Sequence, residues 1–250
     1  MVHISLDGAS AATHDAFRGF AGTFDRVVAI LNDLRDLQMS VQVGTTVTRH
    51  NVDELARMVP LLTEYGIRMW SLFFLVPTGR GRQEDMVTPE VAEQVWEWMT
   101  DLERRVPFAI RTTAAPQFRR TVLRRARRES NAPLRLTGAG YQLCDAPSGV
   151  QTRGVNDGKG FLFIDHLGGI CPSGFLQLSA GNVRTHHVSE VYRSSPLFRT
   201  LREPSALRGR CGRCQFADLC GGSRARAYGL SGSYLEEDPL CALTEAEIAR

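Results

Sequence analysis

Four cysteines near the C-terminal end of this 250-residue chain are its strongest candidates for chemistry. They follow the spacing C-x2-C-x5-C-x20-C, as Cys211, Cys214, Cys220 and Cys241. Three thiols from one short loop and a fourth from a later turn can converge on one centre, and thiolates are soft ligands for iron–sulfur clusters and zinc. The spacing favours a cluster, with structural zinc as the main alternative and unliganded thiols as the third.

The residues around these cysteines favour a pocket built from loops. Three glycines near the cysteines would allow the backbone to approach a bulky inorganic core: Gly212, Gly221 and Gly222. Arginines supply positive charge beside thiolates, and the nearest in sequence are Arg208, Arg210 and Arg213. Because a cluster held by four thiolates is anionic, guanidinium groups and backbone N–H groups are expected to stabilise it.

Composition and charge exclude several classes of protein. Hydrophobic residues make up 43% and charged residues 23% of the chain, as in ordinary globular proteins of one or two domains. A formal net charge of +3 is too small to predict a nucleic-acid partner. The chain starts without a secretory signal pattern, and no apolar run is long enough to span a membrane. We therefore expect free thiols in a reducing cytoplasm and no membrane partner.

One basic segment stands out, PQFRRTVLRRARRES at residues 116–130. As a helix it would place Phe118, Val122 and Leu123 on or near one face, with arginines around the rest. A solvated helix face is the simpler interpretation. The alternative is a contact with an acidic partner or with substrate carboxylates, by the group from Arg119 to Arg128.

The first 112 or so residues alternate strand and helix patterns. Expected strands are His3–Asp7, Ser40–Val47, Met69–Val76 and Phe108–Arg111. Expected helices are Thr23–Leu37, a helix capped by Asn51 and ending at Leu62, and Pro89–Arg105. This alternation predicts an α/β fold with a parallel sheet and helices outside it. The first expected strand begins almost directly after Met1, as expected for a chain that contains only the later part of a domain.

After the arginine-rich segment the pattern changes. Turns rich in Gly and Asp separate short strands at Gly160–Ile164 and Ile170–Phe175, and short helices and the cysteine loops follow. We place the boundary near residue 135, so that the predicted domains are residues 1–135 and 136–250.

The chain resembles a known family through several motifs in order. ISLDGASAATHDAFRG, VQVGTTVTRHNVDEL and FFLVPTGRGR look like the second half of the partial (β/α) barrel of radical S-adenosylmethionine enzymes. GGICPSGFLQLSAGNVR, CGRCQFADLCGGSRARAYG and EEDPLC resemble the small α+β iron–sulfur domain, of the SPASM type, that follows it. Within the family the likeness is greatest to members that tailor tetrapyrroles in heme and heme d1 biosynthesis.

The resemblance implies ligands for named residues. It implies one auxiliary [4Fe–4S] cluster on the four cysteines, with a role in electron transfer. For S-adenosylmethionine it implies that Ser5 bonds the ribose, that Arg18 pairs with the methionine carboxylate, and that Leu75 and Val76 pack on adenine; Asp7 belongs to the same group. Ordinary alternatives are a turn at Asp7 and a helix cap at Arg18. No residue is assigned a catalytic role.

Two departures from the family pattern matter. A second cluster of the SPASM type would need cysteines where this chain has Ser173 and Ser223, so Cys144 and Cys171 are expected to be buried or idle thiols. The alternative is a second cluster that uses them, since Cys171 is two residues from Ser173 on a predicted strand. The radical-generating cluster would need C-x3-C-x2-C early in the chain, whereas the first cysteine is Cys144. We expect the chain as written to be inactive in that chemistry. A truncated reading frame is the first explanation, and a pseudogene-like remnant and a split enzyme are the alternatives.

For the complete protein, the resemblance implies an oxidoreductase that modifies tetrapyrrole side chains by radical chemistry, with ferredoxin or flavodoxin as electron donor. An enzyme that matures a peptide or protein is the alternative. A non-catalytic iron–sulfur subunit for electron transfer or binding is the third interpretation, so enzymatic activity is favoured but open.

Overall fold

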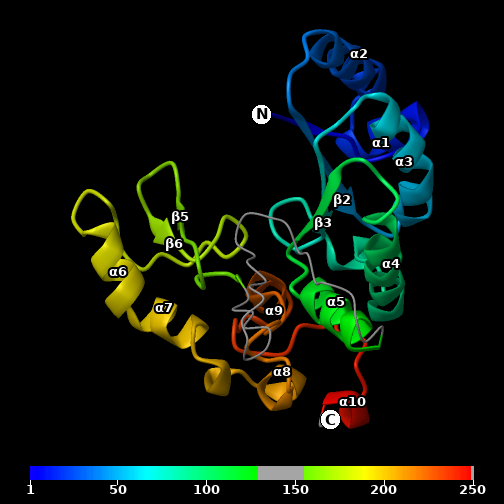
Figure 1. Cartoon of the computed structure of the whole chain (residues 1–250). Helices are drawn as coiled ribbons and strands as arrows, with labels where there is room; N and C mark the ends of the chain where they lie inside the picture. Colours follow the sequence, from blue (N-terminus) through cyan, green and yellow to red (C-terminus); the bar gives the residue numbers. More distant parts are fainter. Residues whose placement is uncertain (129–154, 249–250) are drawn as a thin grey trace, which may run out of the picture. The chain divides into compact units, whose positions relative to one another are not determined.

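The computed structural model describes residues 1–128 and 155–248 and divides the chain into two compact units. Unit 1 contains Met1–Leu75 and Glu84–Thr113, and unit 2 contains Val76–Gln83 and Ala114–Arg250. Figure 1 labels helices and strands of both units. The predicted boundary near residue 135 lies outside the described residues, and the division into units falls earlier, so the arginine-rich helix belongs to unit 2.

Unit 1 is built on four parallel strands in the order β1-β2-β3-β4, as the alternating sequence pattern predicted. The strands are β1 Val2–Ser5, β2 Val41–Val47, β3 Met69–Phe74 and β4 Ala109–Thr113. The helices between them are α1 Ala11–Arg18, α2 Thr23–Asp36, η1 Val52–Glu54, α3 Leu55–Glu64, η2 Gln83–Asp85 and α4 Pro89–Leu102. Right-handed crossovers between sequential strands place the helices on one side of the sheet, and Figure 1 shows α3 and α4 on the same side.

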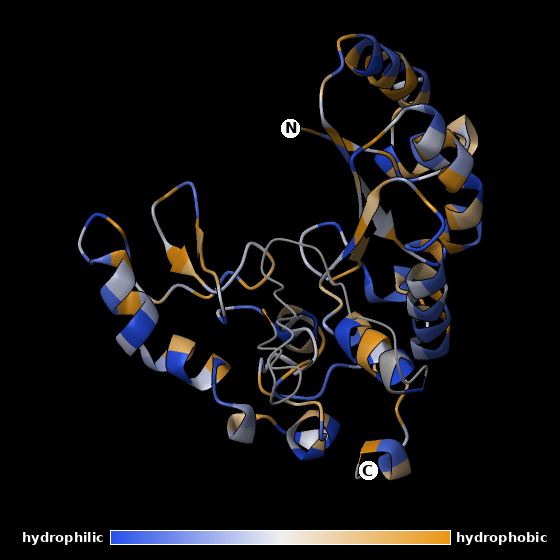
Figure 2. Cartoon of the chain, viewed as in Figure 1, coloured by the Kyte–Doolittle hydropathy of each residue, from blue (hydrophilic) through white to orange (hydrophobic). Residues whose placement is uncertain are grey.

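The helix-covered face of the sheet forms the core of unit 1. Trp70, Leu72 and Phe74 alternate along β3 and are at most 1% exposed. The rings of Phe74 and Trp96 lie 5.2 Å apart, which fixes α4 against the sheet. Figure 2 shows hydrophilic and hydrophobic residues alternating around α4, as expected for a helix with one buried side.

The helix after β2 starts differently from the prediction. Asn51 precedes the 3-10 helix η1, but its side chain makes no capping hydrogen bond there. Its amide nitrogen donates to the carbonyls of Asp7 and Thr46, and its oxygen accepts from the N–H of Thr48. Asn51 is 1% exposed, so it joins the ends of β1 and β2 instead of capping a helix. Thr88 does cap α4, by accepting the N–H of Val91.

Unit 2 has little regular structure. Its helices are α5 Gln117–Arg128, α6 Val188–Ser194, α7 Pro196–Leu201, η3 Pro204–Ala206, α8 Gly209–Arg213, α9 Arg224–Ser231 and α10 Glu245–Ile248. Its strands β5 Phe163–Ile164 and β6 Ile170–Cys171 form an antiparallel pair. Both are shorter than predicted. Pro172 has no N–H for a ladder, and the Ser173 hydroxyl accepts the N–H groups of Phe175 and Leu176 in a turn.

No helix in the described ranges combines the length and the apolar character that crossing a bilayer requires.

Candidate metal centre

One cavity in unit 2 collects the four predicted cysteine ligands. Cys211 and Cys214 come from α8 and its end, Cys220 from the turn before α9, and Cys241 from the segment between α9 and α10. The cavity is also lined by Gln117, Arg120, Arg210, Phe216, Ala217, Gly221, Gly222, Leu243 and Ile248. Its free space is about 20 Å³, about the room of one water, so the side chains must move apart to admit a cluster.

Each of the four sulfur atoms accepts a hydrogen bond from a backbone N–H. The N–H of Asp238 donates to Cys211 Sγ, that of Phe216 donates to Cys214 Sγ, and that of Gly222 donates to Cys220 Sγ, each at 3.4 Å. The N–H of Leu243 bonds Cys241 in the same way. Three of the donors follow their cysteine by two residues, so the loops themselves present N–H groups to sulfur. Such hydrogen bonds stabilise negative charge on cluster thiolates.

Burial acts against free thiolates in this cavity. It raises the pKa of the Cys211, Cys220 and Cys241 thiols, that of Cys220 to about 12, and nearby arginines and N–H groups only partly oppose it. Without a ligand these groups are therefore neutral thiols at physiological pH. A coordinating metal replaces the proton of a thiol, so the donor set suits a metal centre that supplies the missing positive charge.

The cations beside the thiols differ in part from those predicted. Arg210 lines the cavity and donates to the carbonyl of Cys241 at 3.0 Å. Arg208 and Arg213 instead pair at the surface with Glu236 and Glu245. The other close cations come from elsewhere in the chain: Arg120 on α5 and Arg224 at the start of α9, each 1% exposed.

Both interpretations of the arginine-rich helix therefore fail at its first two arginines. Arg119 is 5% exposed and donates to the carbonyls of Val155 and Leu219, so it is part of the interior of unit 2. Arg120 faces the cysteine cavity. Arg124 pairs with Glu247 of α10 at 3.0 Å. The helix anchors the cysteine loops with its N-terminal half.

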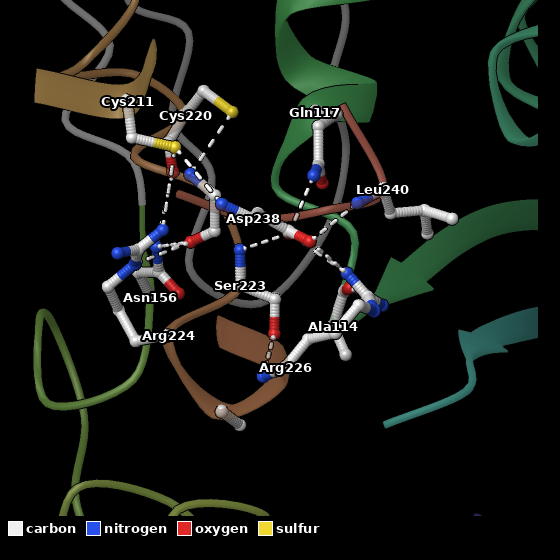
Figure 3. A network of polar contacts seen from close by, with 12 residues as sticks. Ala114, Gln117, Asn156, Cys211, Cys220, Ser223, Arg224, Arg226, Asp238 and Leu240 are labelled. Carbon is white, nitrogen blue, oxygen red and sulfur yellow. Dashed lines mark hydrogen bonds and ion pairs between the residues drawn. The ribbon is translucent and has the colours of Figure 1, made fainter. Parts of the chain in front are cut away.

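Asp238 joins the segments that carry the cysteines (Figure 3). Its fully buried carboxylate pairs with Arg226 at 2.9 Å and accepts the amide of Gln117 and the N–H groups of Ser223 and Leu240. Burial opposes ionisation, yet pairing with Arg226 and these N–H groups hold the pKa of Asp238 below its usual range. The same residue's N–H bonds Cys211 Sγ. Sequence reasoning missed this residue.

Gly222, one of the glycines predicted to approach an inorganic core, lies close to protein atoms. Its φ is +65°, which favours glycine, and a Cβ there would lie 2.6 Å from Asp238 Cβ and 3.1 Å from Cys211 Sγ. The close neighbours are thus the carboxylate segment and a thiol.

The four thiols surround a cavity without forming a single-ion site. Within residues 1–128 and 155–248, no three His, Cys, Asp or Glu side chains are arranged to hold one metal ion. The donor chemistry, the N–H···S bonds and the buried arginines nevertheless fit a larger anionic centre.

The two serines at the second-cluster positions have structural roles. Ser173 closes the turn after β6, and Ser223 caps α9 by accepting the N–H of Arg226. Cys171 is a buried free thiol on β6 whose pKa burial raises. Cys144 lies outside the described residues.

Two of the predicted S-adenosylmethionine residues, Ser5 and Asp7, lie at the carboxyl end of β1. Ser5 is exposed there, and Asp7 is fully buried. Asp7 pairs with Arg18 at 2.5 Å and accepts the N–H of Thr46 at 2.6 Å. Burial raises the pKa of Asp7, and the hydrogen bond from Thr46 and the charge of Arg18 oppose this rise. Arg18 pairs with Asp7 while its side chain remains 32% exposed.

The two predicted adenine contacts belong to different units. Leu75 follows β3 in unit 1 and is half-buried. Val76 is 5% exposed and packs in unit 2 with Leu176, Leu201 and Ala225. In the described part of the chain, Val76 is therefore a core residue.

The face of the sheet opposite α4 is more polar, which the strand patterns did not reveal. Strand register and alternation put on it Ser5, Gly44, Ser71 and Arg111, successive partners across the four strands. Gln42 donates to Ser71 at 2.8 Å, and the exposed His3 stacks on Phe73 across Gly44.

A larger cavity of about 690 Å³ lies in unit 1 between α3, α4 and the segment before α4. Its lining is mostly apolar, including Val52, Leu55, Val91 and Trp98, and it contains none of the predicted site residues.

A parallel α/β unit followed by a loop-rich unit that gathers four thiols defines an α/β protein with a cysteine-rich C-terminal region. No family model matches the chain. It is 37% identical over 238 residues to the AdoMet-dependent heme synthase of Methanosarcina barkeri, covering 95% of this chain and 66% of that protein. It is 33% identical over 251 residues to the mycofactocin maturase MftC of Mycobacterium ulcerans, covering 96% and 60%.

The fold resembles that of Streptococcus suis SuiB bound to S-adenosylmethionine, with a TM-score of 0.66 and 16% identity over 96% of this chain and 53% of SuiB. The chain belongs to the radical S-adenosylmethionine family, in its SPASM branch. It spans about two thirds or less of the length of these relatives.

Proposed function

We propose that unit 2 is a SPASM-like domain that holds one [4Fe–4S] cluster on Cys211, Cys214, Cys220 and Cys241. The observation that carries this proposal is the shared cavity in which every cysteine sulfur accepts a backbone N–H. A bound cluster supplies a centre that accepts or donates one electron. The buried Arg120 and Arg224 balance its negative charge, and Asp238 holds the cysteine segments together.

For unit 1 the proposal is the second half of a partial barrel whose polar sheet face binds S-adenosylmethionine. Ser5 is exposed at the carboxyl end of β1, where ligands of α/β sheets bind. Asp7 pairs with Arg18, and this partly exposed arginine would also pair with the methionine carboxylate of the ligand. Exposed Ser5 would donate to or accept from a ribose hydroxyl.

The complete protein is proposed to modify a tetrapyrrole in heme biosynthesis, in a reducing cytoplasm and with ferredoxin or flavodoxin as electron donor. The support is the 37–38% identity to proteins named AdoMet-dependent heme synthase and 29% identity to one named pre-heme d1 synthase. The candidate propionate-binding residues of the arginine-rich helix are Arg124, Arg125 and Arg128, because Arg119 and Arg120 are buried.

Peptide maturation is the second candidate, since the mycofactocin maturase is 33% identical over nearly the whole chain. Titrating the anaerobically prepared protein with a propionate-bearing iron porphyrin and with a precursor-type peptide separates the two. Saturable binding of the porphyrin alone supports the first candidate, and saturable binding of the peptide alone supports the second. Binding of neither, together with no binding of S-adenosylmethionine by calorimetry, favours a non-catalytic iron–sulfur subunit.

The cluster is tested by reconstituting the chain with iron and sulfide under anaerobic conditions. We expect about four irons and four sulfides per chain, and a strong loss of both in Cys220→Ala. Cys171→Ala is the matched control, because Cys171 is equally a buried free thiol but does not line the cavity. Zinc in place of iron, or full loading of Cys220→Ala, would contradict the proposal.

A further inference from the structure

Arg224 is a buried cation whose hydrogen bonds go to carbonyls and to one sulfur. It begins α9 and is 1% exposed. Its Nε donates to the carbonyl of Gly222, and its Nη1 donates to those of Tyr234 and Glu236 at 3.0 and 2.7 Å. Its Nη2 lies 3.6 Å from Cys211 Sγ. The three carbonyls hold the planar guanidinium in one orientation, with its remaining nitrogen at the thiol (Figure 3).

Arg224 and its neighbour Arg226 differ in their electrostatic partners. Arg226 is also buried, but it pairs directly with the carboxylate of Asp238. Among the described residues no carboxylate lies within ion-pair distance of Arg224, and the charge of Asp238 acts on it only from farther away. Taking a guanidinium out of water is costly unless an anion compensates it. The thiol of Cys211 is the group nearby that becomes anionic on binding metal.

We propose that Arg224 sets the reduction potential of the cluster bound through Cys211. The inference rests on the proposed cluster. Reduction adds one electron, and hence one negative charge, to the cluster and its thiolates; the electron comes from the external donor. A fixed positive charge in a site of low dielectric attracts the reduced state more strongly than the oxidised state. Arg224 therefore favours reduction, and the cluster in turn places negative charge at the guanidinium nitrogen that faces Cys211.

The first test is a redox titration of the anaerobically reconstituted full chain, followed by electron paramagnetic resonance. Arg224→Met is expected to retain iron and sulfide but to lower the midpoint potential. We expect the ratio of reduced to oxidised cluster at a fixed solution potential to fall about tenfold, which for one electron corresponds to ~59 mV. Arg224→Lys should recover part of the shift, because it keeps the charge but not the planar fork.

Arg213→Met is the matched control. Arg213 lies in α8 beside the cysteines, but it is exposed and pairs with Glu245, so its loss should leave the potential unchanged. A shift of equal size in Arg213→Met and Arg224→Met would overturn the assignment, because it would trace the effect to net charge alone.

The second test measures the stability of the cluster-free chain in urea. Arg224→Met leaves the carbonyls of Gly222, Tyr234 and Glu236 without this donor. Arg226→Met leaves the buried Asp238 carboxylate without its cation. We therefore expect both variants to unfold at lower urea than the wild type, and Arg226→Met to unfold first. A loss of stability in Arg224→Met without any change in the potential of the loaded protein would show that Arg224 is merely structural and would overturn the inference.

The outcomes separate the two proposals. Iron-loaded Arg224→Met with an unchanged potential overturns the role of Arg224 and leaves the proposed cluster intact. Absence of iron and sulfide from the wild type overturns the cluster and this inference together. If the Met variant does not load, Arg224→Gln is titrated in its place. Loss of the cluster from both neutral variants, but not from Arg224→Lys, would reassign Arg224 to retention of the cluster and likewise overturn the inference.

Discussion

At the scale of single residues, the thiols were visible in the sequence but the charges that surround them were not. Arg120 precedes Cys211 by a long stretch of chain, and Asp238 is separated from the C-x2-C pair by α9. Spacing arguments favour near neighbours, and they selected Arg208, Arg210 and Arg213. Of these, Arg210 lines the cysteine cavity, whereas Arg208 and Arg213 pair with surface carboxylates. Burial, not proximity in sequence, decides which cation acts on a thiol.

Gly222 offers a test at this scale. Gly222→Ala places a Cβ 2.5 Å from Arg224 Nη2 and 2.6 Å from Asp238 Cβ, at a φ of +65°. We expect a loss of more than about 2 kcal/mol in the free energy of unfolding, because the strain of the left-handed conformation adds to a backbone shift, and a loss of iron loading.

Gly232→Ala is the control for backbone strain alone. Its φ is +74°, but a Cβ there meets nothing within 4 Å. We expect it to cost about 1 kcal/mol in urea unfolding and to load iron normally. Equal effects of the two variants would show that the crowding at Gly222 does not matter.

At the scale of elements, local patterns predicted the strands of unit 1 well and their connections less well. The alternating pattern located all four strands within a few residues, because a parallel sheet buries nearly continuous apolar runs. The start of α3 was misjudged, since Asn51 bonds the ends of two strands that are distant in sequence. A capping residue and a tertiary bridge look alike until the partners are known.

The junction of α1 and α2 gives a pH prediction. Asp15, in α1, accepts the Thr23 hydroxyl and the N–H groups of Gly22 and Phe24 at the start of α2. These bonds, that of Thr23 foremost, hold the pKa of Asp15 below its ordinary value of 3.8. Because the folded pKa is the lower one, this stabilisation is present above about pH 4 and disappears as the pH falls through the folded pKa.

Asp15→Asn should therefore unfold at lower urea than the wild type at neutral pH, and the difference should shrink below the ordinary carboxyl pKa. Asp33→Asn, at an exposed position of α2, is the control and should show little difference at either pH. A wild-type advantage that persists undiminished in strong acid would contradict the role given to the Asp15 carboxylate.

At the scale of the whole molecule, the chain consists of two units held by different means. Unit 1 has a regular sheet with an apolar core of Trp, Leu and Phe side chains. Unit 2 has short helices and two-residue strands, and its cysteine region depends on buried arginines and carboxylates. Loop-rich regions with small cores commonly depend on a bound metal for stability.

Removing the metal should consequently affect the two units unequally. After a chelator strips reconstituted protein, amides of α8, α9 and the segment to Cys241 should exchange with deuterium faster, whereas amides of β1 to β4 should keep their protection. Hydrogen exchange with mass spectrometry measures both in one sample. Equal loss of protection in both units would contradict this division of stability.

The sequence by itself determined the parallel α/β pattern and the four candidate ligands, because strand periodicity and cysteine spacing are local properties that need no knowledge of distant contacts. It indicated the family through the resemblance of several motifs in order. Only the tertiary structure decided that Arg120 and Arg224 lie at the thiols, that Val76 is a core residue of unit 2, and that Asp238 joins Gln117, Ser223 and Leu240. The physical reason is that electrostatic neighbours are chosen by burial and by the need to satisfy every buried charge, and these conditions act across the folded chain.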